Sequence, residues 1–397
     1  MPNIQQLSLV LLSIAIVACQ QGREEPAHLD KNLTVFYLQG TPEVRSFVDS
    51  CVAKYSIRFG GKALSKPCTV LELLSLAANT NRKDSASLFI LPYEYIPAVA
   101  ALGSVMVLPD VLSDDYAPLG NVCHWQGKRV AIPLTCDIAM LLLSGPIASS
   151  SGSSAAGLDT DQMFALQDTF SSRYKATWTS AGDDPRSSAQ TIASWLGDHG
   201  GCIIDDSGNV VVNSAMNKQA LTAYADLAKG RELETRRQQR ASFAQGNLAM
   251  LYGNSSYLPL LRKQKPSTAF SATYVNPHAR GSSTPLLHGY GVCVSGTFPD
   301  TDPMYAYLTD LRHVVKQHES LGFPTFSSYW HNTLRSSDSS MQLIAKRMRI
   351  ARPMHSHPQW PTIVILLERA VLDALYGNQS VEDVLDGLQE DIEGLIS

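Results

Sequence analysis

Polar and aromatic side chains follow two apolar runs whose composition is typical of buried strands. They are Gln39, Gly40 and Thr41, directly after "LTVFYL", and Tyr93, Glu94 and Tyr95, directly after "LFILP". Flat aromatic faces cover the C–H face of a pyranose ring, and carboxylates or amides bind its hydroxyl groups. The two triplets therefore favour contact with a polyhydroxylated solute. The alternative is that each triplet is a solvated turn.

Two pairs of acids, Asp183-Asp184 and Asp205-Asp206, suggest hydrolysis as an alternative activity. Cleavage of a glycosidic bond needs two carboxyl groups about 5–9.5 Å apart across the bond. Neighbouring residues of a strand point to opposite faces, and "DDSG" at 205–208 is typical of a hairpin turn. The sequence contains no G-x-S-x-G, H-E-x-x-H, G-x-G-x-x-G or G-x-x-x-x-G-K-[ST] motif. We therefore expect no catalytic residue and no cofactor.

A metal site is also disfavoured. His355 and His357 are alternate residues that can face the same side, but no third ligand lies near them in the sequence.

The first residues indicate export. The apolar run from Leu7 to Ala18 is twelve residues long, whereas a helix that spans a bilayer needs about 20. Its length fits the apolar region of a secretion signal, and small Ala18 fits a processing site. Residues 1–18 are thus predicted to be a signal peptide, although the first ten residues lack the usual Lys or Arg.

The order Ile16-Val17-Ala18-Cys19 resembles the lipobox of bacterial lipoproteins. The resemblance implies cleavage before Cys19 and lipids on its sulfur and new amine, since several acyl chains anchor a protein stably. Residues 19–32 then form a lipidated tether at a bacterial membrane, in the periplasm or another extracytoplasmic space. The alternative is an ordinary signal or a buried strand with an incidental cysteine.

Composition predicts a globular chain of two lobes. The 397 residues exceed one typical domain, and 44% are hydrophobic and 17% charged. The net charge of −4 and the lack of a basic cluster argue against nucleic-acid binding. Six cysteines besides Cys19 allow three disulfides outside the cytosol, in fifteen pairings that spacing alone does not decide.

The elements that carry the two triplets alternate between strand and helix. We expect strands at 33–40 and 88–91, a helix from Pro42 with Val44, Phe47, Val48 and Cys51 on one face, and a helix at 97–103. This order predicts a mainly parallel sheet, whose ligands lie at the carboxyl ends of strands. A helix at 215–229 and a flexible loop at 144–157 are also expected.

The C-terminus predicts two amphipathic helices. Pro361 fits a first helical turn, apolar residues recur from Ile363 to Leu375, and Gly377 ends the pattern. Ser380 and Asp383 resemble a capping box at the start of the second helix.

Five segments, in order, resemble the bacterial extracellular solute-binding proteins of family 1, the maltose-binding-like receptors of ABC importers. They are "WQGKRVAIPL" (125–134), "CIIDDSGNVVVNSAMNKQALTAYADL" (202–227), "FAQGNLAMLYG" (243–253), "HGYGVCVSG" (288–296) and "RPMHSHPQWPTI" (352–363). The resemblance implies an α/β, two-lobed periplasmic-binding-protein fold of type II with a hinge and an interlobe cleft. The implied lobes are discontinuous: residues 33–135 with 289–335, and residues 136–288 with 336–397.

The resemblance also implies the function of a monomeric receptor. Such a receptor captures a sugar or small oligosaccharide by hinge closure and delivers it to an ABC permease in the inner membrane. The alternatives are a surface lipoprotein that uses the same fold to bind protein or host matrix and, less favoured, a glycoside hydrolase.

Further ligand contacts follow from matching the family's positions. Asp137, with its neighbour Thr135, stands where members carry an acid at the hinge, and the alternative is a helix cap before "IAMLLL". Ser255 stands where many members have a tryptophan, with Tyr257 beyond it. Two aromatic candidates complete the predicted site: Tyr290, which flanking glycines expose, and Trp360, which faces the cleft or packs at the start of a helix.

Overall fold

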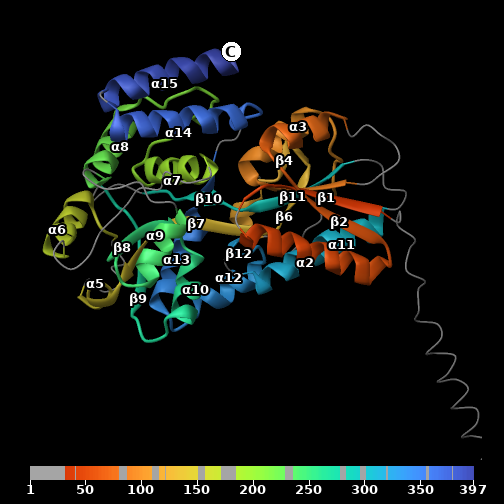
Figure 1. The fold of residues 1–397 in the computed structure, drawn as a ribbon, viewed down its shortest axis with the longest axis horizontal. Coiled ribbons are helices and arrows are strands. Elements are labelled where there is room, and N and C mark those ends of the chain that lie inside the picture. The colour runs from red at the N-terminus through yellow and green to blue at the C-terminus, as the bar shows by residue number, and fades with distance from the viewer. Residues whose placement is uncertain are drawn as a thin grey trace, which may run out of the picture.

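The computed structural model describes residues 32–40, 42–79, 87–109, 116–120, 122–150, 157–170, 185–228, 236–277, 283–295, 301–318, 321–354, 357–377 and 379–397. The predicted signal peptide, Cys19 and most of the tether lie outside these residues. Thr41, His355 and the Asp183-Asp184 pair lie outside them too. Figure 1 shows two α/β bodies side by side, with the C-terminal helices on the left-hand body.

A five-stranded sheet forms the core of one body, in the order β2-β1-β3-β11-β6. Its strands are β1 (Asn32–Leu38), β2 (Lys62–Cys68), β3 (Ser87–Pro92), β6 (Ala131–Pro133) and β11 (Tyr290–Ser295). β1 pairs in parallel with both β2 and β3, whereas β11 runs antiparallel to β3 and to β6. The predicted strand–helix–strand order is confirmed in this part of the chain.

Helices cover this sheet. They are α2 (Pro42–Phe59), α3 (Val70–Asn79), α4 (Ile96–Ala101) and α11 (Thr301–Val314), with single 3-10 turns η1 (Tyr93–Tyr95), η2 (Ala117–Leu119) and η3 (Val315–Gln317). The predicted apolar face of α2 is confirmed, because Val44, Phe47, Val48 and Cys51 are buried. These four residues pack with α11 residues and with one face of the sheet. A small hairpin of β4 (His124–Trp125) and β5 (Lys128–Arg129) precedes β6.

A six-stranded sheet forms the core of the other body. Its strands are β7 (Thr135–Ser144), β8 (Met250–Asn254), β9 (Phe270–Thr273), β10 (Leu286–His288), β12 (Phe323–Pro324) and β13 (Arg352–Pro353). Only the β10–β13 pair is parallel among these ladders, so the expectation of a mainly parallel arrangement is wrong here. The reason is that β10 and β12 both pair antiparallel with β7. β7 is the long strand that directly follows β6 of the first sheet.

Helices surround the second sheet. They are α5 (Gly145–Ser150), α6 (Thr160–Phe170), α7 (Pro185–Asp198), α8 (Ala215–Ala228), α9 (Arg236–Ala244), α10 (Tyr257–Gln264), α12 (Ser327–Leu334), α13 (Ser339–Ile350), α14 (Trp360–Tyr376) and α15 (Val381–Ile396). The loop predicted at 144–157 is wrong over its first half, because Ser144 ends β7 and residues 145–150 form α5, whereas residues 151–156 lie outside the described residues. The helix predicted at 215–229 is confirmed as α8, and both C-terminal helices are confirmed.

The C-terminal helices begin and end as their residues predict. Ser380 Oγ accepts the backbone N–H of Asp383 at 3.1 Å, which satisfies a donor at the start of α15. Gly377 ends α14, and its N–H donates to the Asp373 carbonyl oxygen at 2.8 Å. Among the described helices, none has the length and apolar character that crossing a membrane requires.

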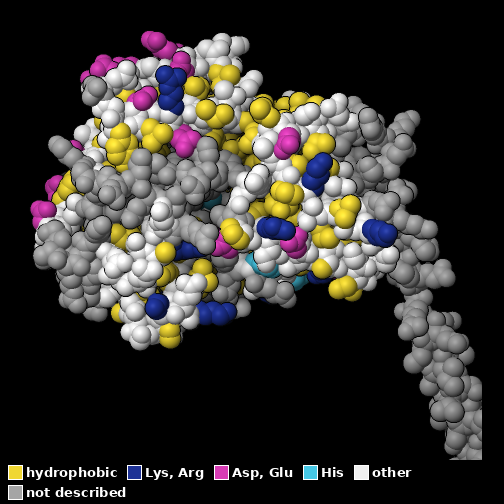
Figure 2. All heavy atoms as spheres, viewed as in Figure 1, with side chains coloured by type: hydrophobic (Ala, Val, Ile, Leu, Met, Phe, Trp, Pro, Cys, Tyr) yellow, Lys and Arg dark blue, Asp and Glu magenta, His cyan; other side chains and the backbone are white. Residues whose placement is uncertain are grey.

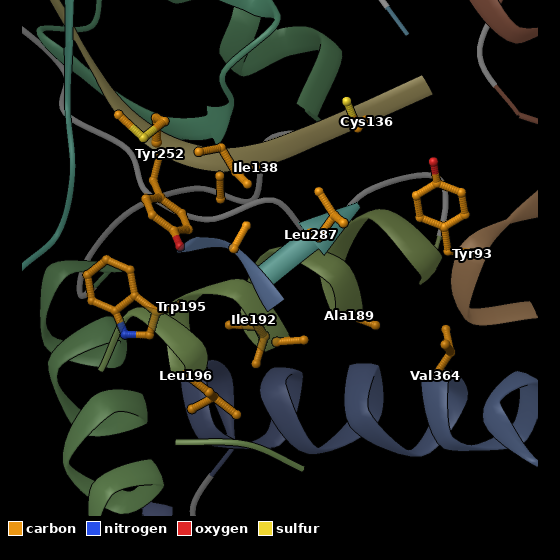
Figure 3. Packing of buried hydrophobic residues seen from close by; sticks show 14 of the residues in the cluster. Tyr93, Cys136, Ile138, Ala189, Ile192, Trp195, Leu196, Tyr252, Leu287 and Val364 are labelled. Atoms are coloured by element: carbon orange, nitrogen blue, oxygen red, sulfur yellow. The ribbon is translucent and has the colours of Figure 1, made fainter. Parts of the chain in front are cut away.

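The chain passes between the two sheets three times. The passages lie at Leu134, between β6 and β7; at Gly289, between β10 and β11; and between His318, which follows η3, and Leu321, which precedes β12. One large cluster of buried side chains includes residues of both bodies. Figure 3 shows Tyr93 at one end of it, with Cys136 on β7 and Val364 on α14 nearby.

Candidate functional site

The three passages meet at Thr135. The Tyr290 N–H donates to Thr135 Oγ1 at 3.0 Å, and the Tyr93 hydroxyl donates to the Thr135 carbonyl oxygen. The Leu134 N–H donates to the Tyr290 carbonyl oxygen at 2.8 Å, and the Tyr93 N–H donates to the Gly289 carbonyl oxygen at 3.0 Å. Thr135 is fully buried. The predicted contacts Tyr93, Thr135 and Tyr290 are thus brought together, and they form the joint between the bodies.

Glycines at two of the passages allow this close approach. Gly289 has φ +152°, and a Cβ there would overlap the Thr135 carbonyl oxygen. Gly322 has φ +129°, and a Cβ there would lie 3.0 Å from the Cys136 carbonyl oxygen and 3.2 Å from Thr135 Cβ. Both φ values are ones that side chains other than glycine rarely adopt. The joint therefore has little tolerance for extra atoms.

A buried arginine, Arg312 of α11, supports the third passage. It donates from Nε to Thr325 Oγ1 at 2.9 Å and from Nη2 to the Thr325 carbonyl oxygen at 3.0 Å. Thr325 Oγ1 in turn donates to the Pro133 carbonyl oxygen at 3.1 Å. The guanidinium also lies 4.5 Å from the centre of the Phe326 ring. Sequence reasoning missed Arg312, because a single arginine in a helix gives no sign of a partner so close to a chain crossing.

Asp137 is buried on β7 and bound by groups that follow β8. Its Oδ1 accepts the Ser255 hydroxyl at 2.6 Å and the Ile138 N–H at 2.8 Å, and its Oδ2 accepts the Ser256 hydroxyl. Burial raises the pKa of Asp137, and the two hydroxyls counteract that rise. The segment is a strand, so Asp137 is not the helix cap weighed as the alternative. Solute contact by Asp137 or Ser255 stays a prediction, because here both side chains bind each other.

The two predicted triplets differ in exposure. Gln39 and Gly40 are exposed at the end of β1. Tyr93, Glu94 and Tyr95 are each at least 95% buried, so they are not a solvated turn. They form η1, which packs against α14 of the other body.

Three further aromatic residues from the prediction lie on the second body or at the joint. Trp360 begins α14 and is 1% exposed, and its Nε1 has no hydrogen-bond partner among the described residues. Tyr257 is half-buried, and its ring lies 3.6 Å from where a Gly253 Cβ would be, which is an ordinary van der Waals contact. Tyr290 is also half-buried.

A separate pocket of about 480 Å³ lies wholly in the second body. The loop after α7, the start of β10 and the β13 segment line it. Asp198 in its wall bonds to Arg347 (3.2 Å) and to the Tyr252 hydroxyl (2.7 Å), and burial raises the pKa of Asp198 to about 6. Sequence reasoning did not find this pocket.

The acids and thiols of the described residues form a hairpin turn and isolated thiols rather than a group of potential metal ligands. Asp205 Oδ1 accepts the N–H groups of Ser207 and Asn209, both at 2.9 Å, as the predicted hairpin turn requires. No group of three potential metal ligands occurs in the described part of the chain. The disulfides that the sequence left open are absent there, since none of the six described cysteines is disulfide-bonded: Cys51, Cys68, Cys123, Cys136, Cys202 and Cys293.

Comparisons with known proteins find likeness in structure only. No protein-family model and no curated protein matches the sequence. An ABC transporter solute-binding protein from Thermotoga lettingae, bound with alpha-D-tagatose, superimposes with a TM-score of 0.76 at 17% identity, over 93% of this chain and 100% of that one.

Two further solved structures give similar values. The GacH receptor of Streptomyces glaucescens, solved unliganded and with acarbose, has a TM-score of 0.72 at 14% identity, over 92% of this chain and 98% of its own. The substrate-binding protein Lmo0181 of Listeria monocytogenes, in complex with cycloalternan, has a TM-score of 0.71 at 12% identity, over 92% of this chain and 99% of its own. The chain therefore has the two-lobed fold of ABC transporter solute-binding proteins.

Proposed function

We propose that this protein is an extracytoplasmic solute receptor that captures a sugar or small oligosaccharide between its lobes and delivers it to an ABC permease. The observation that carries the proposal is the meeting of three chain passages at Thr135, because it leaves two sheets joined at one narrow hinge. The solved structures of the same fold that hold tagatose, acarbose and cycloalternan support a carbohydrate as the solute.

The lobes follow from the sheets. We propose that the described residues within 32–133 and 290–318 form one lobe and those within 135–288 and 323–397 form the other. The lobe boundaries expected from the sequence, with the last one between residues 335 and 336, stay predictions. A solute favours the closed arrangement only if it binds that state better than the open one. Contact with both lobes at once provides this difference in affinity.

The side chains that suit a carbohydrate lie on both lobes. Gln39 is exposed at the end of β1 on the first lobe, and Trp360 begins α14 on the second. The unpartnered Nε1–H of Trp360 is a donor suited to a hydroxyl group of the solute. We assign binding rather than catalysis, because hinge closure needs no reacting group.

Location follows from the N-terminus. Lipids on Cys19 would hold the receptor at the outer surface of a bacterial membrane, beside its permease. The scattered distribution of Lys and Arg on the described surface in Figure 2 agrees with a partner other than nucleic acid. The receptor would act as a monomer.

A second candidate is a surface lipoprotein that binds protein or host matrix. The burial of Tyr93, Tyr95 and Trp360 favours it, since these rings are covered by the protein's own atoms. The carbohydrate receptor remains the better-supported function, because a solute that binds both lobes gives the hinge a role in closure.

Calorimetric titration with tagatose, maltose, acarbose and cycloalternan tests the proposal. We expect at least one to bind with a dissociation constant in the micromolar range or below. A folded sample that binds none of them, and that carries no small molecule in native mass spectrometry, would favour the second candidate.

A further inference from the structure

An ion pair joins the two lobes between helices α2 and α9. Arg240 Nη2 of α9 lies 2.7 Å from Glu43 Oε1 of α2. Glu43 belongs to the lobe with the five-stranded sheet, directly after the Gln39–Thr41 segment, and α9 belongs to the other lobe. The two residues are 197 positions apart in sequence. A movement of the lobes that separates α2 from α9 would therefore break this contact.

Both partners are held in place before they meet. Glu43 lies in the first turn of α2, where the positive end of the helix dipole favours a carboxylate. The Arg240 guanidinium lies 5.2 Å from the centre of the Tyr257 ring, and that ring packs over Gly253. Because each side chain is already restrained, forming the pair costs less conformational entropy than it does for two free side chains.

The pair is partly shielded from water. The side chains are 24% exposed for Arg240 and 26% exposed for Glu43. Fully exposed pairs contribute little and are screened by salt, whereas deeply buried pairs are screened much less. An ion pair of intermediate exposure contributes measurably to the stability of the contact, and its contribution still depends on ionic strength.

We propose that Glu43 and Arg240 form an interlobe latch, which holds the solute-free protein in the closed arrangement and is released as ionic strength rises. Such a latch makes closure partly independent of the solute. The solute then adds its own contacts to an equilibrium that the latch has already shifted. Because the latch acts without solute, it goes beyond the proposed function, and its test does not depend on which solute binds.

Glu43→Gln is the most direct variant, because it removes the charge while leaving Arg240 stacked on Tyr257. Arg240→Gln removes the other partner, and the swapped double variant E43R/R240E tests whether opposite charges alone restore the contact. The matched control is Glu382→Gln, which breaks the Lys218–Glu382 pair (2.8 Å) between two helices of a single lobe. Thermal unfolding of each variant verifies that it is folded.

The measurement is the solute-free distance between fluorophores on α3 and α15, read by energy transfer at low and at high ionic strength. We expect E43Q and R240Q to raise the open-to-closed ratio roughly fivefold, as for a pair worth about 1 kcal/mol. Salt should open the wild type and E382Q, but have little further effect on E43Q. The swapped variant should regain part of the closed population.

Two results would overturn the latch. One is a wild-type distance that does not change with salt, and the other is an E43Q distance equal to that of the wild type at low salt. Either result leaves the carbohydrate titrations free to succeed, so failure of the latch and failure of the proposed receptor are distinguishable.

Discussion

Thr135 accepts the backbone N–H of Tyr290 at 3.0 Å, which ties the first and second chain passages together where they cross between the lobes. The third passage packs against the same residue through Gly322. We expect a hinge of three neighbouring chain passages to bend as a unit, because each backbone segment restrains the others. The relationship also explains why two passages contain glycine, since Thr135 occupies the space that a side chain would need.

Gly289→Ala should destabilise the protein strongly. An added methyl group would overlap the Thr135 carbonyl oxygen and approach the Tyr93 ring, at a φ that alanine rarely adopts. We expect a loss of about 2–4 kcal/mol in the free energy of unfolding, measured with denaturant. Gly208→Ala is the control, because Gly208 also has positive φ (+86°) but open space around it, and it should cost about 1 kcal/mol. Equal losses for the two variants would contradict the proposed crowding at the hinge.

Trp360→Phe should lower solute affinity and should cost less stability than the same change at a buried tryptophan whose Nε1–H is bonded within the protein. The Nε1–H of Trp360 has no partner among the described residues, so its removal breaks no hydrogen bond within them. We expect affinity for the carbohydrate to fall roughly tenfold, as for one lost hydrogen bond, in calorimetric titration.

Trp330→Phe is the matched control for this prediction. Trp330 is equally buried, but its Nε1–H donates to the Pro324 carbonyl oxygen at 3.1 Å. The Trp330→Phe variant should lose about 1 kcal/mol of stability and keep the wild-type affinity for the carbohydrate. A W360F protein that is destabilised but binds normally would show that Trp360 only packs at the start of α14.

Asp198 should make stability fall as pH rises from about 4 to about 6. Burial raises its pKa from 3.8 to about 6, so the folded protein binds this proton more tightly than the unfolded chain. The contribution is fully present below the unfolded pKa and is lost as pH rises through the folded one, with an upper size of roughly 3 kcal/mol.

The measurement is the free energy of unfolding against pH for the wild type, D198N and Y252F. The difference in the free energy of unfolding between the wild type and D198N should shrink between about pH 4 and about pH 6 and then level off. Y252F removes a donor to Asp198 Oδ2, so it should move the decline to higher pH. A difference that does not change with pH would contradict the raised pKa.

The free cysteines predict that no disulfide stabilises the fold. Without reductant, the denatured protein should yield six titratable thiols apart from Cys19, counted with a chromogenic disulfide reagent. Under native conditions only Cys202, the one partly exposed thiol of the described six, should react, and C202S should remove that reaction. A lower count in denaturant that rises after reduction would reveal a disulfide.

Local elements could be predicted from the sequence because their signals are local. Ser380 and Gly377 mark the ends of the C-terminal helices through their own side chain or its absence. Gly246, two residues after the end of α9, has φ +80°, the left-handed conformation that glycine commonly adopts after a helix. The apolar face of α2 follows from the helical period alone.

Contacts between distant segments could not be predicted in the same way. Asp137 and Ser255 are 118 positions apart, and nothing in either segment indicates that the acid is bound internally. The same holds for Glu43 with Arg240, and for Arg312 with Thr325 across a chain crossing. Such pairs depend on how distant elements pack together. Several residues of the hinge could therefore be predicted from the sequence, but the groups that they bind could not.

Small-angle X-ray scattering with and without a saturating carbohydrate, its binding verified by titration, tests the central claim most directly. We predict that the solute lowers the radius of gyration, and that E43Q enlarges this change by opening the solute-free protein. Identical scattering curves with and without a bound carbohydrate would contradict a receptor that works by closing its two lobes.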